Sequence, residues 1–235
     1  WISAMNLHSE QISTAPLKIV GRLVDASNAT LQAVIEDSDP LIKVIYKPIA
    51  GEKPLWDFED GNLASRELSA FIVSDEAGFQ VVPFTILRDG PFGIGMVQQW
   101  IEIDNKVDIV EFGQLEDKQI RRLTLFDAVI NNTDRKFGHL LLDDSGKLFG
   151  CDHGVAFHKE DKLRTVLWQF AGQDFDQEEI DLLKTLLKTD WHEKLSDYLT
   201  ADEIQALNVR IQKLFNQRKF PEPSLTWPAV PWPPL

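Results

Sequence analysis

The first half of the chain has the pattern of a small sheet with one helix. Apolar positions recurring every three or four residues over 63–77 predict a helix, with Asn62 as its N-cap and Gly78 after its end. Residues 1–15 are polar and weakly patterned, so we expect a loose arm there. Short runs of β-branched and aromatic residues predict strands within 17–36 (two strands joined by a turn at 26–30), 41–48, 81–88 and 94–102.

The second half changes to a helical period. Helices are predicted over 116–131 and over most of 177–217, where Thr200 and Glu203 have the spacing of a capping box. Within 140–152, two short apolar runs flank an Asp-Asp-Ser-Gly turn, which predicts a β hairpin.

This order of elements predicts an α+β fold of two lobes with a ligand-binding cleft between them. We expect an N-terminal arm (1–16), a lobe of sheet and helix (17–103), a mainly helical lobe with a short β hairpin (104–220) and a Pro/Trp-rich tail (221–235).

The tail carries six prolines, which exclude a helix. It is expected to lie as polyproline against the body through Trp227 and Trp232, and a disordered tail is the alternative.

Composition narrows the choice of partners. With 43% hydrophobic and 26% charged residues, the chain has the means to form a core and a solvated surface. The formal net charge of −13 repels phosphate backbones and anionic headgroups, so we expect no nucleic-acid partner and no stable docking on an anionic membrane. No apolar run is long enough for a membrane span, no secretory signal is visible, and the single cysteine, Cys151, excludes an internal disulfide; we therefore expect a cytoplasmic location.

Two residues of the predicted sheet lobe form a candidate ion pair. Lys47 ends an apolar strand, and Glu67 shares a helix face with Leu63, Ala70 and Phe71. A carboxylate on an apolar face needs a cation, and Lys47 is the nearest candidate in the preceding strand. The alternatives are a solvated Lys47 and a Glu67 that pairs with Arg66 at the rim.

A second cluster of polar residues surrounds the predicted hairpin. Because the hairpin brings its outer ends together, Asp134 and His139 before it can meet Asp152 at its exit. Oxygen-rich ligands with one imidazole suit Mg²⁺ or Mn²⁺. An Asp beside such a metal can orient or deprotonate an attacking hydroxyl. A turn-rich polar loop whose Asp and Asn side chains act as caps is the structural alternative; the whole cluster is Asn131, Asn132, Asp134, His139, Asp152, His153 and His158.

The segments NTDRKFGH and CDHG resemble the catalytic and metal-binding loops of the phosphatidylinositol 3/4-kinase-like superfamily of atypical kinases. Across residues 17–235 the chain is similar to a bacterial group of small proteins of that superfamily, through segments such as VIYKPIAGEKPLWDF, LASRELSAF and KLRTVLWQFAG.

The resemblance implies a protein-kinase-like fold and roles for named residues. Lys47 would bind the α/β-phosphates of ATP and pair with Glu67, Asp134 would act as catalytic base, and Asp152 would hold Mg²⁺ or Mn²⁺. The turn would cover the phosphates through Ser27, Asn28 and Thr30, and a hinge would bind adenine through Met96, Gln98, Gln99 and Trp100.

Two departures from the family pattern affect these roles. His139 stands where the second metal ligand is Asn, and imidazole shifts preference toward Mn²⁺ or other transition metals, although His139 can instead donate to phosphate. The turn at 26–30 has no glycine, so its backbone approaches phosphates less freely.

The segment 162–172 follows the metal loop. Lys162 and Arg164 are candidates for binding an anionic group of the acceptor, or they pair with nearby acids. Trp168 and Phe170 are expected to pack in the core.

The leading functional hypothesis is an ATP- and metal-dependent phosphotransferase that acts on a soluble protein or small-molecule hydroxyl, not on a phosphoinositide. A catalytically inactive nucleotide-binding scaffold is the second hypothesis. A third is a metal-dependent hydrolase built on Asp134, His139, Asp152 and His153. The acceptor, and transfer of AMP rather than phosphate, are not readable from the sequence.

Overall fold

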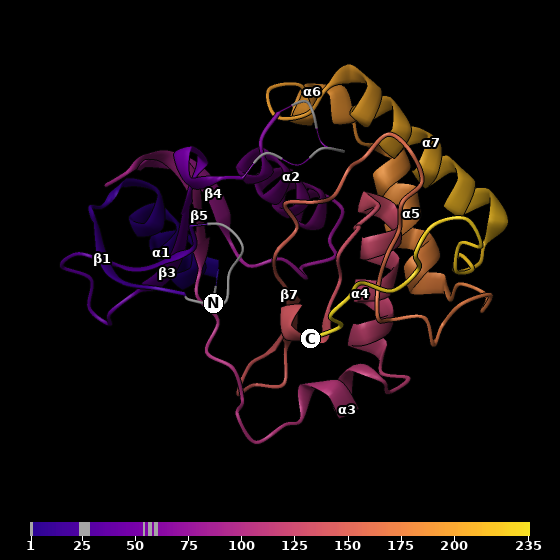
Figure 1. Cartoon of the computed structure of the whole chain (residues 1–235), viewed down its shortest axis with the longest axis horizontal. Helices are drawn as coiled ribbons and strands as arrows, with labels where there is room; N and C mark the ends of the chain where they lie inside the picture. Colours follow the sequence, from indigo (N-terminus) through magenta and orange to yellow (C-terminus); the bar gives the residue numbers. More distant parts are fainter. Residues whose placement is uncertain (1, 24–28, 54, 56–57, 59–60) are drawn as a thin grey trace.

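The computed structural model describes residues 2–23, 29–53, 55, 58 and 61–235. A sheet with one covering helix lies on one side of the molecule and a mainly helical part on the other, with a single helix between them (Figure 1). The predicted α+β architecture is confirmed. The placement of the lobe boundary near residue 103 stays a prediction.

The sheet is antiparallel with strand order β1-β2-β3-β5-β4. Its alternating inward residues pack with Ile12 of the first helix into a core of their own. The strands are β1 (Leu17–Arg22), β2 (Leu31–Ile35), β3 (Lys43–Pro48), β4 (Thr85–Gly90) and β5 (Gly93–Gln99).

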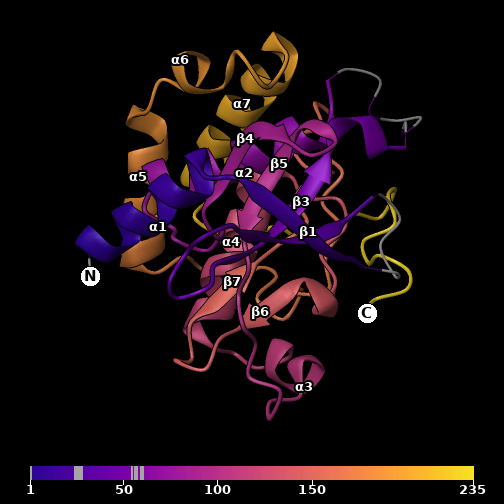
Figure 2. The ribbon, with the colours of Figure 1, turned by 90° about the vertical axis from the view of Figure 1, so that its left-hand side faces the viewer.

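The expected loose arm is a helix instead, α1 (Ile2–Thr14). One apolar residue of this helix, Ile12, is fully buried against the sheet. The Ile12 carbonyl also accepts a hydrogen bond of 2.6 Å from Arg88. Figure 2 shows α1 lying beside the strands. Tertiary packing on one apolar residue overrides the weak local pattern.

The strand predicted over 81–88 begins later, at Thr85. Val81 and Val82 are buried in the core of the helical part and not in the sheet. Pro83, which lacks an N–H for sheet pairing, separates them from the strand. The pairing of β4 with β5 continues to Gly90 and Gly93, so the turn between these strands is tight.

Helix α2 (Leu63–Glu76) confirms the prediction for 63–77. The Asn62 side chain accepts a hydrogen bond from Ser65 N at 2.7 Å, and Gly78 follows the end with φ +81°. The backbone amides of its first residues also donate to Glu52, at 2.8 and 2.9 Å, which places an anion at the helix N-terminus.

The helical part encloses the larger core, which includes apolar side chains of α2. Its elements are α3 (Ile109–Gly113), α4 (Lys118–Ile130), the 3₁₀ helix η2 (Phe137–His139), β6 (Leu140–Leu142), β7 (Leu148–Gly150), α5 (Gln177–Lys188), α6 (Trp191–Leu195) and α7 (Ala201–Gln217). A second 3₁₀ helix, η1 (Ile49–Gly51), follows β3 in the sheet part. The β6–β7 hairpin and the capping box of Thr200 and Glu203 at the start of α7 are both as predicted.

The tail has no helix, as expected, and runs from α7 back toward the middle of the molecule (Figure 1). Two backbone carbonyls and one buried proline, Pro231, hold it: Ala229 O accepts from Thr165 N at 3.0 Å, and Pro234 O accepts from Phe137 N at 2.9 Å. Contact through Trp227 is confirmed by its half-burial, whereas Trp232 does not pack on the body, since it is 88% exposed.

Candidate functional site

Lys47 lies between two carboxylates that come from distant parts of the chain. Its Nζ is 2.7 Å from Glu67 Oε1 on α2 and 2.8 Å from Asp152 Oδ1 after β7. Glu67 also accepts a hydrogen bond of 2.9 Å from His153 N through its other oxygen. Glu67 therefore ties strand β3 to the segment that carries Asp152. It is buried and not at the rim, and Arg66 pairs with Glu203.

The pKa values of Lys47, Glu67 and Asp152 are shifted by burial and by the neighbouring charges. The Lys47 ammonium holds the pKa of the Asp152 carboxyl well below its usual range, and burial raises the pKa of Glu67. Burial alone would lower the pKa of Lys47, but Asp152 and Glu67 outweigh it and raise that pKa. Lys47 is therefore a cation and Asp152 an anion throughout the physiological pH range.

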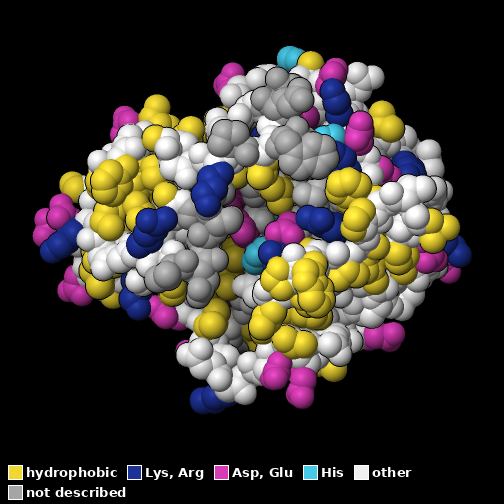
Figure 3. Space-filling model, in the orientation of Figure 1, with side chains coloured by type: hydrophobic (Ala, Val, Ile, Leu, Met, Phe, Trp, Pro, Cys, Tyr) yellow, Lys and Arg dark blue, Asp and Glu magenta, His cyan; other side chains and the backbone are white. Residues whose placement is uncertain are grey.

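Asp134 and Asp152 line one cleft of about 420 Å³. Two cations flank Asp134: Lys136 Nζ lies 3.3 Å from Oδ2, and Arg164 Nη2 lies 3.6 Å from Oδ1. Figure 3 shows acidic, basic and histidine side chains gathered in a hollow near the centre of this face, beside a patch of hydrophobic side chains. Sequence reasoning missed Lys136, although its place two residues after Asp134 could have marked it.

Arg135 holds the loop that carries Asp134, and sequence reasoning missed this role too. Its fully buried guanidinium forms two hydrogen bonds to Asp127 of α4, at 2.8 and 2.9 Å, and donates to Cys151 O at 2.9 Å. One buried side chain thus joins α4, the Asp134 loop and the exit of β7. A fixed bidentate geometry of this kind requires arginine.

His139 and His153 have different surroundings. His139 Nε2 lies 3.5 Å from Asp152 Oδ2, and burial lowers the pKa of His139. His153 is fully buried and its Nε2 is 2.7 Å from the Arg135 guanidinium, so that ring nitrogen accepts a hydrogen bond. His153 is therefore occupied inside the protein, which argues against the four-residue hydrolase site.

The asparagines and His158 of the cluster support loops. Asn131 caps α4 in a left-handed conformation (φ 55°), and its amide donates to the His158 and Glu160 carbonyls at 2.9 and 2.6 Å. Asn132 bridges Asp127 and the Asp134 backbone amide. These residues thus have the structural role that was the alternative to a functional site, since their side chains hold the polar loop in place.

The predicted phosphate-covering turn lies mainly outside the described residues. Ser27 and Asn28 fall in its undescribed part, and Thr30 is buried immediately before β2. Its role in phosphate binding stays a prediction.

The predicted hinge lies within strand β5. Met96, Gln98 and Gln99 pair with β3 on one side and β4 on the other, so their backbone groups are engaged in the sheet. The Trp100 amide donates to Lys43 O at 3.1 Å. The adenine-binding role of Met96, Gln98, Gln99 and Trp100 stays a prediction.

Of the two candidate acceptor-binding cations, only Arg164 lines the cleft. Its Nε donates to Thr133 O at 2.7 Å, which fixes the orientation of the guanidinium. Lys162 is buried outside the described cleft lining, 3.3 Å from His158 Nε2 and over the Trp227 ring. Phe170 packs in the core as expected, whereas Trp168 is half-buried and donates to Ala229 O at 2.8 Å.

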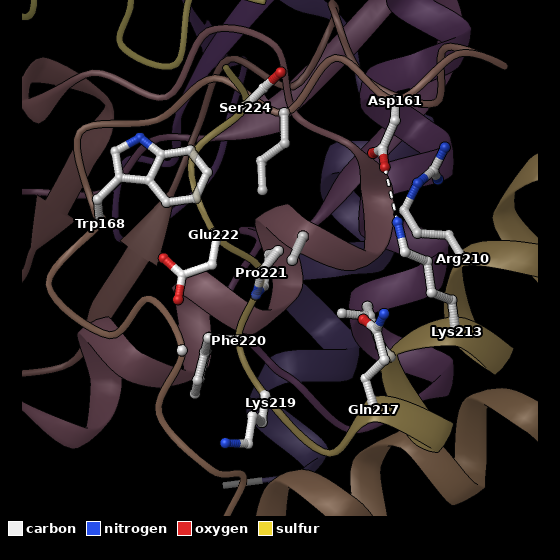
Figure 4. A pocket seen from close by; sticks show the side chains of 14 residues that line it. Asp161, Trp168, Arg210, Lys213, Gln217, Lys219, Phe220, Pro221, Glu222 and Ser224 are labelled. Atoms are coloured by element: carbon white, nitrogen blue, oxygen red, sulfur yellow. Dashed lines mark hydrogen bonds and ion pairs between the residues drawn. The ribbon is translucent and has the colours of Figure 1, made fainter. Parts of the chain in front are cut away.

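A larger hollow of about 610 Å³ lies on the helical part, and its lining contains neither Asp134 nor Asp152. Figure 4 shows Arg210 and Lys213 of α7 on one side and Trp168 and Glu222 on the other. Arg210 is engaged with the Val129 and His158 carbonyls, and Lys213 with Asp161 at 3.2 Å. Asp134 and Asp152 thus lie outside this hollow.

Asp152 and His139 lie side by side and offer one carboxylate and one imidazole to a divalent cation, which would need further ligands from elsewhere. Within the described ranges, no group of three or more His, Cys, Asp or Glu side chains could hold a metal ion by itself. Mg²⁺ is commonly held by one or two protein ligands together with substrate phosphates. Asp152 is ionised, and the lowered pKa of His139 keeps its imidazole neutral, as a metal ligand must be. His139 Nδ1 is buried without a hydrogen-bond partner in the described structure.

Comparisons with known proteins show the family and the fold of the chain. A scan against known protein families gives no match. The protein Rv2133c of Mycobacterium tuberculosis is 37% identical over 271 residues, covering 98% of this chain and 97% of its own length. This chain belongs to the Rv2133c family.

Comparison with solved structures shows the fold of this chain. The Golgi casein kinase superposes with a TM-score of 0.54 at 14% identity, over 92% of this chain and 74% of its own. The same kinase with Mn and ADP bound gives a TM-score of 0.56, over 92% and 76% of the two chains at 14% identity. The Helicobacter pylori proinflammatory kinase CtkA gives 0.50 at 11% identity, over 89% and 94%. The chain has a protein-kinase-like fold.

Proposed function

We propose that this protein is an ATP- and divalent-metal-dependent phosphotransferase with a soluble hydroxyl acceptor. The observation that carries the proposal is the placement of Lys47 between Glu67 and Asp152, with Asp134 in the same cleft as Asp152. A cation anchored by a helix carboxylate beside a metal-binding acid is the arrangement that kinases use for nucleotide phosphates. The solved kinase with Mn and ADP bound supports the same choice of ligands.

In this proposal Lys47 binds the α- and β-phosphates of ATP, and Glu67 positions it. Asp152 and His139 hold Mg²⁺ or Mn²⁺, which neutralises phosphate charge when bound. Asp134 accepts the proton of the acceptor hydroxyl while the acceptor oxygen bonds to the γ-phosphorus and the bond to the leaving ADP oxygen breaks. Lys136 lies 3.3 Å from Asp134 and balances its charge beside the transferred group.

The acceptor in this proposal is soluble, in keeping with the net charge of −13. This sets the protein apart from a lipid kinase, even though its motifs resemble those of the phosphatidylinositol 3/4-kinase-like superfamily.

Replacing Asp152 by Asn tests the proposal. We expect the variant to lose binding of ADP in the presence of Mn²⁺, measured by calorimetry, and to lose ATP turnover. Asp144→Asn, in the exposed turn of the same hairpin, is the matched control and keeps both. Unchanged turnover in Asp152→Asn would refute the assignment.

Asp134→Asn separates catalysis from binding. Because Asp134 contacts the acceptor and not the nucleotide in this proposal, we expect ADP binding to persist while transfer falls by roughly 100-fold or more.

The second candidate function is a nucleotide-binding scaffold without catalysis. The presence of His139 beside Asp152, where the resembling kinases have Asn, favours it. Wild-type protein that binds ADP and Mn²⁺ but never consumes ATP, across a panel of acceptors, would establish this function instead.

A further inference from the structure

The C-terminal tail presents an indole at the mouth of the cleft. Trp232 is 88% exposed, yet it lines the cleft that contains Asp134 and Asp152. The carbonyls of Ala229 and Pro234 anchor the chain on either side of it, and Pro231 is buried. An exposed aromatic ring on an anchored segment loses little conformational freedom when a ligand stacks on it.

A second indole borders the same cleft. Trp227 also lines it, and its Nε1 is buried without a hydrogen-bond partner in the described structure. Two indoles, those of Trp227 and Trp232, thus line the cleft that contains Asp134 and Asp152.

Arg164 supplies a cation to this half of the cleft. It lies 3.6 Å from Asp134, longer than the 2.7–2.9 Å or so of a tight charge-assisted hydrogen bond, and its orientation is already fixed by Thr133 O. The guanidinium thus has donors left for a second anion. Leu55 and Phe58 form an apolar wall of the cleft.

We propose that Trp227, Trp232 and Arg164 form the acceptor subsite, and that the acceptor is a small sugar-like ring carrying a phosphate or carboxylate. This inference rests on the proposed function and names its substrate class. The negative face of an indole attracts the polarised C–H groups of a sugar ring, and Arg164 binds the anionic group. A hollow of about 420 Å³ suits a small molecule, since small-ligand pockets span about 300–1,000 Å³.

The test measures binding, so it does not need turnover. Glucose 6-phosphate and glucuronate are titrated into the full chain with ADP and Mn²⁺ and followed by calorimetry; glucose is the uncharged comparison. We expect at least one of the anionic sugars to bind at least tenfold more tightly than glucose. Trp232→Ala is expected to weaken that binding at least tenfold. Leu225→Ala, a fully exposed apolar residue on the same tail outside the described cleft lining, is the matched control and leaves it unchanged.

Three outcomes would overturn the subsite. They are no binding of either anionic sugar, equal binding by wild type and Trp232→Ala, and preferential binding of an acidic serine peptide that Trp232→Ala weakens. Failure of ADP to bind would count against the phosphotransferase alone, because sugar binding that depends on Trp232 would still support the subsite.

Discussion

At the scale of single residues, the site depends on side chains that touch no proposed substrate. Arg135 and Asp127 are both almost fully buried, and their paired hydrogen bonds hold the Asp134 loop against α4. The Arg135 contacts with Cys151 O and His153 extend the same support to the segment carrying Asp152. The spacing of the two acids in the cleft is therefore set by a cation that binds neither.

Arg135→Met is expected to destabilise the protein by about 3–5 kcal/mol, because it leaves the Asp127 carboxylate buried and unpaired. Urea unfolding measures the loss. Lys184→Met is the control, since Lys184 pairs with Asp181 on the exposed surface and its loss is expected to leave the midpoint nearly unchanged. Equal midpoints for the two variants would contradict the supporting role of Arg135.

At the scale of elements, helix α2 contacts both the sheet and the helical part of the molecule. It carries Glu67 to Lys47 of the sheet, while its apolar residues pack in the core of the helical part. Two ion pairs join it to the C-terminal helices: the buried Arg66–Glu203 and the exposed Lys194–Glu76 at 2.7 Å. The position of Glu67 is therefore fixed by α7 as much as by the sheet.

Arg66→Met and Lys194→Met form a matched pair for testing this connection. We expect the buried change to cost about 3–5 kcal/mol, since Glu203 is then left without its cation, and the exposed change to leave the stability nearly unchanged. Nucleotide affinity, measured by calorimetry on the folded protein, should fall in Arg66→Met as Glu67 loses its fixed position. A stable Arg66→Met variant with full affinity would show that α2 does not depend on α7.

At the scale of the whole molecule, net charge and exposed apolar surface have opposite effects on binding to a lipid surface. The net charge of −13 repels anionic lipid, whereas Trp232, Leu225 and Leu235 of the tail are exposed beside the helical part. Among the described helices, none combines the length and apolarity needed to cross a bilayer.

We expect no co-sedimentation with vesicles containing phosphatidylserine or phosphatidylinositol at roughly 0.15 M salt, where charges are screened beyond about 8 Å. Neutral phosphatidylcholine vesicles are the control and report on the tail alone. Binding to the anionic vesicles that weakens as salt rises would contradict a soluble acceptor.

The sequence by itself determined the elements whose signals are local. Alternating strands, the Asn62 cap of α2, the Thr200–Glu203 capping box and the β6–β7 hairpin are written within a few neighbouring residues. The pairing of Lys47 with Glu67 could also be predicted, because a carboxylate on an apolar helix face needs a cation.

Only the tertiary structure decided what depends on distant partners. The helix α1 forms because Ile12 finds the sheet, and the backbone of Met96–Gln99 is occupied because two strands flank β5. Arg135 is the support of the site, and Trp232 stands at its mouth, because of partners far away along the chain. Local patterns record which face of an element is apolar, but not which other element covers it, because burial is a property of the folded chain.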